Sequence, residues 1–391
     1  MSLVFQDLGE LVNFKGGGTP SRNVEEYWNS SIPWATVKDL NEGITLTETQ
    51  EFISELGLKN SASNLITKGT IIIPTRMALG KVVISEIDVA INQDLKAVFV
   101  KDKEKLDVKY LLRFLESNKE NIASMGKGAT VKGITLDQLK AIKIPLPPLV
   151  EQRRIASILD QADELRQKRQ QAIEKLDQLL QATFIDMFGD PEKNPKKWNK
   201  VVLGDICDQK DRVNYGVVQP GNEFEGGVPL IRVGDIDGGI LSFHLIKRID
   251  PEIEKDYSRS RIKGNEVLVS CVGSIGTIAK VPNEAIGFNI ARAITRVPLQ
   301  DKRIINFVAE CLKTEAIQNY FKKNTRTVSQ PTLNVSFVKE TEIIFPNEEK
   351  ILDFCKIVDK VEFQKELLQK ALVMQESLFQ SLQNQAFNGT L

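Results

Sequence analysis

Histidine is almost absent from this chain of 391 residues, which contains only His244. A Ser-His or Cys-His nucleophile would depend on this one side chain, which lies in a Phe-His-Leu stretch that we expect to be a strand. Zinc sites need closely spaced histidine or cysteine ligands, and no two cysteines form a Cys-x-x-Cys pair. We therefore expect no metal site, and we expect reduced core thiols at the four cysteines, Cys207, Cys271, Cys311 and Cys355.

Long apolar runs and net charge are missing as well. No apolar stretch approaches the roughly 20 residues that cross a bilayer, and the N-terminus has no basic-then-apolar signal layout. We therefore expect the protein in the cytosol. The 52 basic residues balance the 52 acidic ones, which excludes a protein that holds nucleic acid by its overall charge. A polyanionic partner would need local basic patches.

Motifs for nucleotide binding and catalysis are also absent. The glycines 16–18 precede Thr19-Pro20-Ser21, but a P-loop needs four residues between its glycines and then a lysine. The stretch 126–130 (GKGAT) has one residue between its glycines and follows an expected helix. Around Ser274, VGSIG lacks the first glycine of the Gly-x-Ser-x-Gly elbow, and no Asn/Asp-Pro-Pro-Tyr/Phe run of an amino-methyltransferase is present. We therefore predict neither an active site nor a bound cofactor.

What the sequence does contain is one module written twice. Residues 8–11 (LGEL) return as 203–206 (LGDI), and residues 32–40 return as 228–236, with offsets that drift only from 195 to 199. Further matches keep the same order: Lys68-Gly69 with Lys263-Gly264, Gly80 with Gly276, Asn92 with Asn289, Thr130-Val131 with Thr327-Val328, Pro147 with Pro346, and Asp160 with Asp359.

The first part of each module, residues 1–147 and 191–346, is predicted to be an α+β globule. Short β-rich runs such as 69–74 (GTIIIP) and 266–270 (EVLVS) alternate with glycine and proline. One helix is expected inside each globule, near residues 108–121 and 303–323.

The second part of each module, residues 148–190 and 347–391, is predicted to be a long helix. Apolar residues recur at a spacing of three and four, and no proline or glycine interrupts residues 151–188 or 348–385. Two such apolar stripes, related by the repeat, predict a pseudo-two-fold antiparallel coiled coil with the globules at opposite ends. The alternative is that each helix is an ordinary amphipathic helix that packs on its own domain. The expected interface residues are Ile155, Ile158, Leu159, Ala162, Leu165, Leu176, Leu180, Phe354, Ile357, Val361, Leu368, Leu372 and Leu382.

Polar and basic side chains that read base edges or hold phosphates punctuate the β structure of both globules. Any one of them is an ordinary solvated residue, but as a set in two copies they indicate a nucleic-acid surface. They are Arg76, Lys81, Gln93, Lys96, Lys127 and Lys132 in the first globule, and Arg232, Arg292, Arg326, Ser329 and Gln330 in the second.

Three groups of residues together resemble a known family. The first is 17–21 (GGTPS) followed by Tyr27-Trp28 and Ile32-Pro33-Trp34. The second is 144–148 (IPLPP) leading to Glu151-Gln152, and the third is 184–191 (FIDMFGDP). In order and spacing they resemble the DNA specificity subunit of type I restriction-modification systems over essentially the whole chain.

The resemblance implies two target-recognition domains, each of which reads half of a split double-stranded DNA site. The long helices would act as spacers and would dock methyltransferase subunits, expected to be two, which restriction subunits join. The chain itself would catalyse nothing and need no cofactor. The glycine loop would then be a turn, with Thr19 and Arg22 as phosphate contacts, and Lys38 and Ser274 join the candidate DNA contacts.

The second module departs from the family pattern. It has no Gly-Gly-Thr-Pro equivalent before Val228-Pro229, and its residues 345–349 (FPNEE) lack the double proline and the Glu-Gln pair. Three alternatives remain open: a subunit of a methylation-only complex, a self-sufficient DNA-acting enzyme, and a coiled-coil scaffold.

Overall fold

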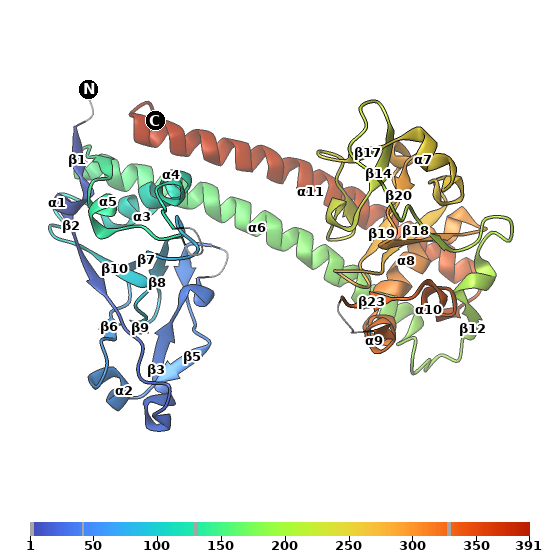
Figure 1. Ribbon diagram of the computed structural model, residues 1–391, viewed down its shortest axis with the longest axis horizontal. Helices are drawn as coiled ribbons and strands as arrows, with labels where there is room; N and C mark the ends of the chain where they lie inside the picture. Colours follow the sequence, from blue (N-terminus) through green and yellow to red (C-terminus); the bar gives the residue numbers. More distant parts are fainter. Residues whose placement is uncertain (1–3, 41–42, 129–131, 327–329) are drawn as a thin grey trace. The chain divides into compact units, whose positions relative to one another are not determined.

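The computed structural model describes residues 4–40, 43–128, 132–326 and 330–391. The chain forms two compact units (Figure 1): unit 1 comprises residues 1–170 and 371–391, and unit 2 comprises residues 171–370. Each unit therefore contains one globule, the start of one long helix and the end of the other. Within the described ranges, no helix is both long and apolar enough to cross a lipid bilayer.

Unit 1 is built on two small sheets and a two-stranded ribbon. The strands pair in the orders β2-β10-β7-β8-β4, β5-β3-β9-β6 and β1-β11. The strands are β1 Phe5–Asp7, β2 Val12–Gly16, β3 Trp28–Ala35, β4 Thr45–Leu46, β5 Glu51–Ile53, β6 Asn64–Ile66, β7 Ile71–Pro74, β8 Val83–Ser85, β9 Val89–Ile91, β10 Leu95–Val100 and β11 Lys143–Pro145. The helices are α1 Leu8–Leu11, α2 Glu55–Lys59, α3 Val108–Ser117, α4 Lys119–Ser124 and α5 Leu136–Lys140, with 3-10 turns η1 Glu25–Tyr27 and η2 Val37–Asp39.

The central strand β7 explains why the five-stranded sheet is covered on both faces. Side chains of a strand point alternately to opposite faces. Ile71 and Ile73 enter the core cluster that contains helix α3, whereas Ile72 enters the cluster that contains Ile91 of the second sheet. The predicted β-rich run 69–74 thus contains the strand β7, which is buried on both sides.

Unit 2 has the same plan with shorter strands. They pair in the orders β13-β21-β18-β19, β17-β14-β20, β12-β24, β15-β16 and β22-β23. The strands are β12 Asn199–Val202, β13 Asn214–Tyr215, β14 Val228–Ile231, β15 Ile236–Asp237, β16 Ile240–Leu241, β17 Lys247–Ile249, β18 Glu266–Ser270, β19 Ile278–Lys280, β20 Asn289–Ile290, β21 Ile294–Pro298, β22 Thr325–Arg326, β23 Thr332–Leu333 and β24 Glu342–Phe345. The helices are α7 Pro251–Lys255, α8 Ile305–Lys313, α9 Glu315–Lys323 and α10 Val335–Lys339, with 3-10 turns η3 Leu203–Ile206, η4 Val233–Asp235, η5 Ser258–Ser260, η6 Asn283–Ala285 and η7 Lys302–Ile304.

The strand registers show which residues of the two modules are equivalent. β3 pairs in parallel with β9, and β14 pairs in parallel with β20, so Ile91 corresponds to Ile290. In unit 1 the N–H of Asn92 donates to the carbonyl of the last residue of β3. In unit 2 the N–H of Ala291 donates to the carbonyl of the last residue of β14. The sequence match of Asn92 with Asn289 is therefore wrong, because Asn289 occupies the register position of Ala90. The matched stretches at 130–131 and 327–328 include residues outside the described part of the chain.

The glycine loop of unit 1 is a site of close backbone packing. A Cβ on Gly17 would lie 1.8 Å from the carbonyl oxygen of Ile91, and the N–H of Gly18 donates to that oxygen at 3.0 Å. Gly216 has the same relation to Ile290, with 1.7 Å to its carbonyl oxygen. The second module therefore does contain an equivalent of this loop, although only one glycine of the Gly-Gly-Thr-Pro motif is retained.

Two local expectations fail for simple reasons. Each inner helix is interrupted: Asn118 separates α3 from α4, and Thr314 separates α8 from α9 with an extended ψ of 148°. His244 lies exposed in a turn that follows β16, not in a strand, because β16 ends at Leu241.

The long helices lie within their predicted ranges, with α6 at Leu149–Phe188 and α11 at Glu348–Asn388. α6 ends at Gly189, whose φ of +82° is the left-handed conformation that closes many helices. α11 starts after Pro346, where the side chain of Asn347 accepts the N–H of Lys350.

The two helices run antiparallel within each unit. In unit 2, Phe184 packs on Phe354 with ring centroids 5.5 Å apart, and Asp177, earlier on α6, pairs with Lys365, later on α11. In unit 1, the Arg166 guanidinium lies 5.3 Å from the Phe379 ring centre. The predicted antiparallel coiled coil is thus present.

The expected interface residues differ in burial. Ile155, Leu159, Leu180, Phe354 and Val361 are buried, and Ile158, Ala162, Leu176, Ile357, Leu368, Leu372 and Leu382 are half-buried. Leu165 is 57% exposed, which contradicts its assignment. Asp163 and Arg166 occupy the buried face at that turn, and Leu165 follows Asp163 by two positions, about 200° around the helix.

A buried arginine joins the globule of unit 1 to α6. Arg113 on α3 is 3% exposed, and its guanidinium donates to Asp160 at 2.8 Å, Asp163 at 3.0 Å and Glu116 at 2.8 Å. Asp163 also accepts from Arg166 at 2.8 Å. Arg113, a side chain of the globule, therefore pairs with the carboxylates of Asp160 and Asp163 on α6.

We expect Gly17→Ala and Gly216→Ala to lower the free energy of unfolding by about 3 kcal/mol or more, because each new methyl group meets a backbone oxygen that cannot move aside. Urea unfolding of the purified variants measures this. Gly234→Ala is the control, since its Cβ would have no heavy atom within 4 Å. Equal stability of all three variants would contradict the close-packing role.

We expect Arg113→Met to cost about 3–5 kcal/mol, because Glu116 would keep its carboxylate without this cation and the buried Asp163 would keep only Arg166 as a partner. Lys168→Met, which breaks an exposed pair with Glu164, should change stability by less than about 1 kcal/mol. Chemical denaturation of both variants tests the difference. An Arg113 variant as stable as the Lys168 variant would show that the network contributes little.

Candidate nucleic-acid interface

Three chain segments of unit 1 meet at one end of its five-stranded sheet. The N–H of Thr75, after β7, donates to the carbonyl of Asp94 in the β9–β10 loop at 2.7 Å. The N–H of Met77 donates to Lys132 at 3.2 Å, and Lys127 and Gly133 exchange two backbone bonds of 2.9 Å. Loops far apart in sequence are thereby held side by side on a rigid sheet edge.

Six of the predicted residues lie on or beside these segments or, in the case of Thr19, contact them from the glycine loop, and we call these six residues loop patch 1. They are Thr19, Arg76, Gln93, Lys96, Lys127 and Lys132. The Thr19 hydroxyl donates to the Gln93 side chain, and the Lys96 ammonium donates to the Gln93 carbonyl at 2.8 Å. Arg76 lies 4.0 Å from Asp94 and is 67% exposed.

The electrostatics of loop patch 1 favour an incoming anion. Burial lowers the pKa of the Lys96 ammonium, Asp94 offsets part of this effect, and the positive charge of Arg76 lowers it further. A phosphate placed beside Arg76 and Lys96 would stabilise both cations.

Three predicted residues of unit 1 lie elsewhere. The Arg22 guanidinium donates to Glu51 at 2.6 and 2.8 Å and stacks 3.7 Å from the Trp28 ring centre. These hydrogen bonds raise the pKa of Arg22, so its charge is already paired. Lys38 is exposed near Glu51, and the Lys81 ammonium donates to the carbonyl of Leu40 at 2.6 Å.

Unit 2 assembles its own set of loops at the equivalent edge. Cys271 N–H, after β18, donates to Ala293 at 2.8 Å, and Val272 bridges Thr332. Arg292 N–H donates to Val217 at 2.9 Å. Four predicted residues, Ser274, Arg292, Arg326 and Gln330, lie on these loops and form loop patch 2.

Two predicted residues of unit 2 are not in loop patch 2. Arg232 caps the turn η4 and donates to Asp235 at 2.9 Å and to Leu245 at 3.0 Å, which commits its guanidinium to the fold. Ser329 lies outside the described residues.

Sequence reasoning missed two features of these surfaces. Met77, 50% exposed with φ of 54°, stands where unit 2 has Gly273 with φ of 77°. An alignment of the two modules through Gly80 and Gly276 reveals this substitution. The second feature is a cationic hollow in unit 2 lined by Arg212 and Arg259, for which the linear sequence carries no motif.

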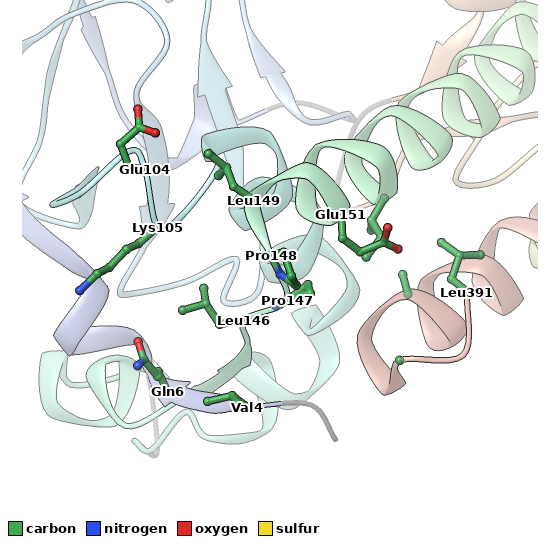
Figure 2. A pocket seen from close by; sticks show the side chains of 13 residues that line it. Val4, Gln6, Glu104, Lys105, Leu146, Pro147, Pro148, Leu149, Glu151 and Leu391 are labelled. Carbon is green, nitrogen blue, oxygen red and sulfur yellow. The ribbon is translucent and has the colours of Figure 1, made fainter. Parts of the chain in front are cut away.

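A different hollow of about 680 Å³ lies in unit 1 where residues 146–148 meet the start of α6 (Figure 2). Its walls include Val4, Leu146 and Leu149, together with the carboxylates of Glu104 and Glu151. It shares no residue with loop patch 1, and its apolar and acidic lining suits a protein segment better than a phosphate.

The groups capable of catalysis are poorly disposed for it. Burial raises the pKa of Cys207 and Cys311 to about 12, and that of Cys271 and Cys355 to about 11, so these thiols stay protonated at neutral pH. In the part of the chain that the structure describes, no group of three or more His, Cys, Asp or Glu side chains is placed to hold a metal ion.

The chain matches the family model described as type I restriction modification DNA specificity domain, over residues 4–175 and again over residues 195–372. It is 28% identical to the type I restriction enzyme EcoBI specificity subunit of Escherichia coli, over 77% of this chain and 69% of that protein. It is 27% identical to the MjaIX specificity subunit of Methanocaldococcus jannaschii, over 90% of this chain and 84% of that protein.

Among solved structures, the S subunit of a type I restriction-modification system from M. genitalium shares the fold. Its TM-score is 0.57 at 18% identity, over 99% of this chain and 96% of that one. The two family matches coincide with the two modules of the repeat. The chain therefore belongs to the type I restriction-modification DNA specificity family.

Proposed function

We propose that this chain is the DNA-reading subunit of a type I complex and that each of its recognition domains reads one half of a split target. The observation that carries this proposal is the presence of equivalent loop patches in the two units. Each patch combines exposed cations with amide or hydroxyl groups on a rigid sheet edge, as base and phosphate recognition requires.

Recognition and spacing are assigned to different parts of the chain. Residues 1–147 and 191–346 are the proposed target-recognition domains, and residues 148–190 and 347–391 are the proposed spacer helices. Loop patch 1 belongs to the first domain and loop patch 2 to the second. The two patches have different side chains, so the two half-sites should differ in sequence.

We infer that methyl transfer and cleavage belong to partner subunits and that this chain supplies no catalytic group. The protonated buried thiols and the exposed position of His244 support this inference. The same role requires the chain to be in the compartment that holds the DNA, which agrees with the cytosolic location expected from the sequence.

The long helices are the proposed docking surface for methyltransferase subunits, and the two-fold repeat suggests two of them. In unit 1, α11 exposes Val373 by 64%, Met374 by 72% and Leu378 by 56%. In unit 2, it exposes Phe363 by 59% and Leu367 by 47%. Large apolar side chains gathered on a surface mark protein contacts.

Because the chain is electrically neutral, phosphate contacts from partner subunits should supply much of the affinity. We infer that the isolated chain binds DNA weakly and that specificity emerges in the assembled complex. Tight, sequence-specific binding by the purified chain alone would overturn this inference.

We expect co-expression with the methyltransferase subunit of the same operon to produce methylated adenines in a split motif, two short constant blocks around a fixed gap. Mapping of methylated bases in host DNA measures this. Replacing residues 1–147 with another recognition domain should change only one block, because each domain reads its half independently.

The outcomes separate the alternatives. A change in both blocks would contradict modular reading, and a stable complex without methylation would contradict the proposed role. Metal-dependent cleavage by the purified chain would instead support a self-sufficient enzyme.

We expect the double variant Val373→Asp/Met374→Asp to reduce co-purification of the methyltransferase subunit by at least tenfold, because burial of two charges opposes docking. The free energy of unfolding should change little, since both residues are exposed. Gln380→Asp on the same helix is the control. Unchanged co-purification would remove this face from the docking surface.

A further inference from the structure

A four-residue insertion distinguishes unit 2 from unit 1 next to loop patch 2. Lys101 N–H donates to Leu11 in unit 1, and Gln300 N–H donates to Ile206 in unit 2, so these acceptors are equivalent. Five residues separate Leu11 from Gly17, whereas nine separate Ile206 from its counterpart Gly216. The extra residues lie in segment 208–213, which carries two cations.

The insertion is pinned by a buried arginine that has no counterpart in unit 1. Arg296 is fully buried and donates to Asp211 at 2.7 Å and to the buried Glu266 at 2.9 Å. Its register position in unit 1 is occupied by Ala97. Since a buried arginine is costly unless it is paired, its main structural role here is to hold Asp211.

Asp211 keeps its charge, so the anchor persists at neutral pH. Burial alone would raise the pKa of Asp211, but hydrogen bonds from Arg296 and Lys263 hold it below its usual value. The Lys263 ammonium lies 2.9 Å from the carboxylate. Asp211, the acidic side chain of segment 208–213 that faces the interior, is thereby paired with Arg296 and Lys263. In the described chain, it does not pair with the neighbouring cations of the segment.

The backbone around the insertion is fixed, whereas its cationic heads are free. Asn214 donates to the carbonyls of Arg212 at 2.9 Å and Arg259 at 3.1 Å, and Arg296 donates to that of Arg259 at 3.0 Å. In the described ranges, no carboxylate lies within 4.0 Å of the charged groups of Lys210, Arg212 or Arg259. Three cations are therefore presented on a rigid frame.

These residues line a hollow of about 630 Å³ with Tyr215 and Tyr257 on its walls. Asp256 is the one further carboxylate of its lining besides Asp211. A hollow of unit 1 beside the equivalent segment Val12–Phe14 has balanced charge instead, with Asp7 and Glu10 against Lys101 and Lys140.

One wall residue of the hollow, Tyr215, is close along the chain to the backbone that holds Arg292 of loop patch 2. Tyr215 ends β13, and two residues later the carbonyl of Val217 accepts the N–H of Arg292. A duplex that touches Arg292 would thus find the cations of the insertion nearby.

We propose that this hollow binds the phosphodiester backbone of duplex DNA beside the half-site read by unit 2, with Lys210, Arg212 and Arg259 contacting phosphates. The inference rests on the proposed function and adds a backbone contact that unit 1 lacks. Backbone contact is favoured over base reading because no hydrogen bond from a described residue fixes the plane of the Arg212 or Arg259 guanidinium, whereas bidentate base recognition needs a fixed plane.

The test uses the complete methyltransferase complex and a duplex that carries its mapped methylation motif. Arg212→Gln/Arg259→Gln should lower the slope of log K against log salt by about 1.8, at about 0.9 for each phosphate contact. The affinity at 0.15 M salt should fall about 30-fold, and the methylated motif should stay the same.

Two control variants make the result specific. Lys193→Gln/Lys302→Gln removes two exposed cations of unit 2 outside the hollow and should leave the slope unchanged. Arg212→Lys/Arg259→Lys keeps the charges and should retain most of the slope. If the double glutamine variant melts at a lower temperature, Arg259→Gln alone carries the test, with an expected loss of about 0.9.

An unchanged slope in Arg212→Gln/Arg259→Gln would overturn the inference while leaving the proposed function intact. A changed base preference in one half-site would also overturn it, because these residues would then read bases. A wild-type complex that methylates no split motif would refute the proposed function itself, and this inference with it.

Discussion

The structure depends on burial of a seam that neither long helix can cover alone. A 40-residue amphipathic helix with one narrow stripe is unstable by itself in water, so the stripe must find partners. In unit 2 the rings of Phe184, Phe188, Phe307 and Phe354 pack together, which joins α6, α8 and α11. In unit 1, Phe387 of α11 packs on Tyr110 and Phe114 of α3. Each globule is therefore completed by a helical segment from the other module.

This shared burial explains why the recognition loops can vary without loss of the fold. The sheets, α3 or α8, and the helix seam form continuous cores, while the loops at the sheet edge contribute little to them. The backbone crossing at Gly17 and Gly216 fixes where the first loop leaves the sheet, and on either side of that point the two units diverge. Met77 replaces a glycine in one, and an insertion appears in the other.

The repeat, the α+β globules and the antiparallel helices could be predicted because they rest on periodicity and on the absence of proline and glycine over long stretches. The exact residues of the helix seam could not be predicted. A search for apolar residues selects Leu165, whereas the positions that face the seam at that turn are the buried Asp163 and the half-buried Arg166, and Asp163 also pairs with Arg113 of a distant helix. Long-range partners of this kind leave no local pattern. For the same reason the sequence showed basic residues but not which of them meet: Arg76 and Lys132 share one surface, while Arg22 is committed to Glu51.

The neutral composition of this type I specificity subunit conceals an uneven distribution of usable charge. Arg22, Arg113, Arg232 and Arg296 are all paired within the fold, and pairing offsets part of the attraction that each would exert on DNA. Arg76, Lys127 and Lys132 in unit 1, and Arg292 in unit 2, are exposed on loops held by backbone hydrogen bonds. A protein arranged in this way attracts the duplex weakly at long range but orders its contacts at short range, because backbone hydrogen bonds hold each loop in place. Weak attraction and rigid loops together favour discrimination between sequences over affinity for any DNA.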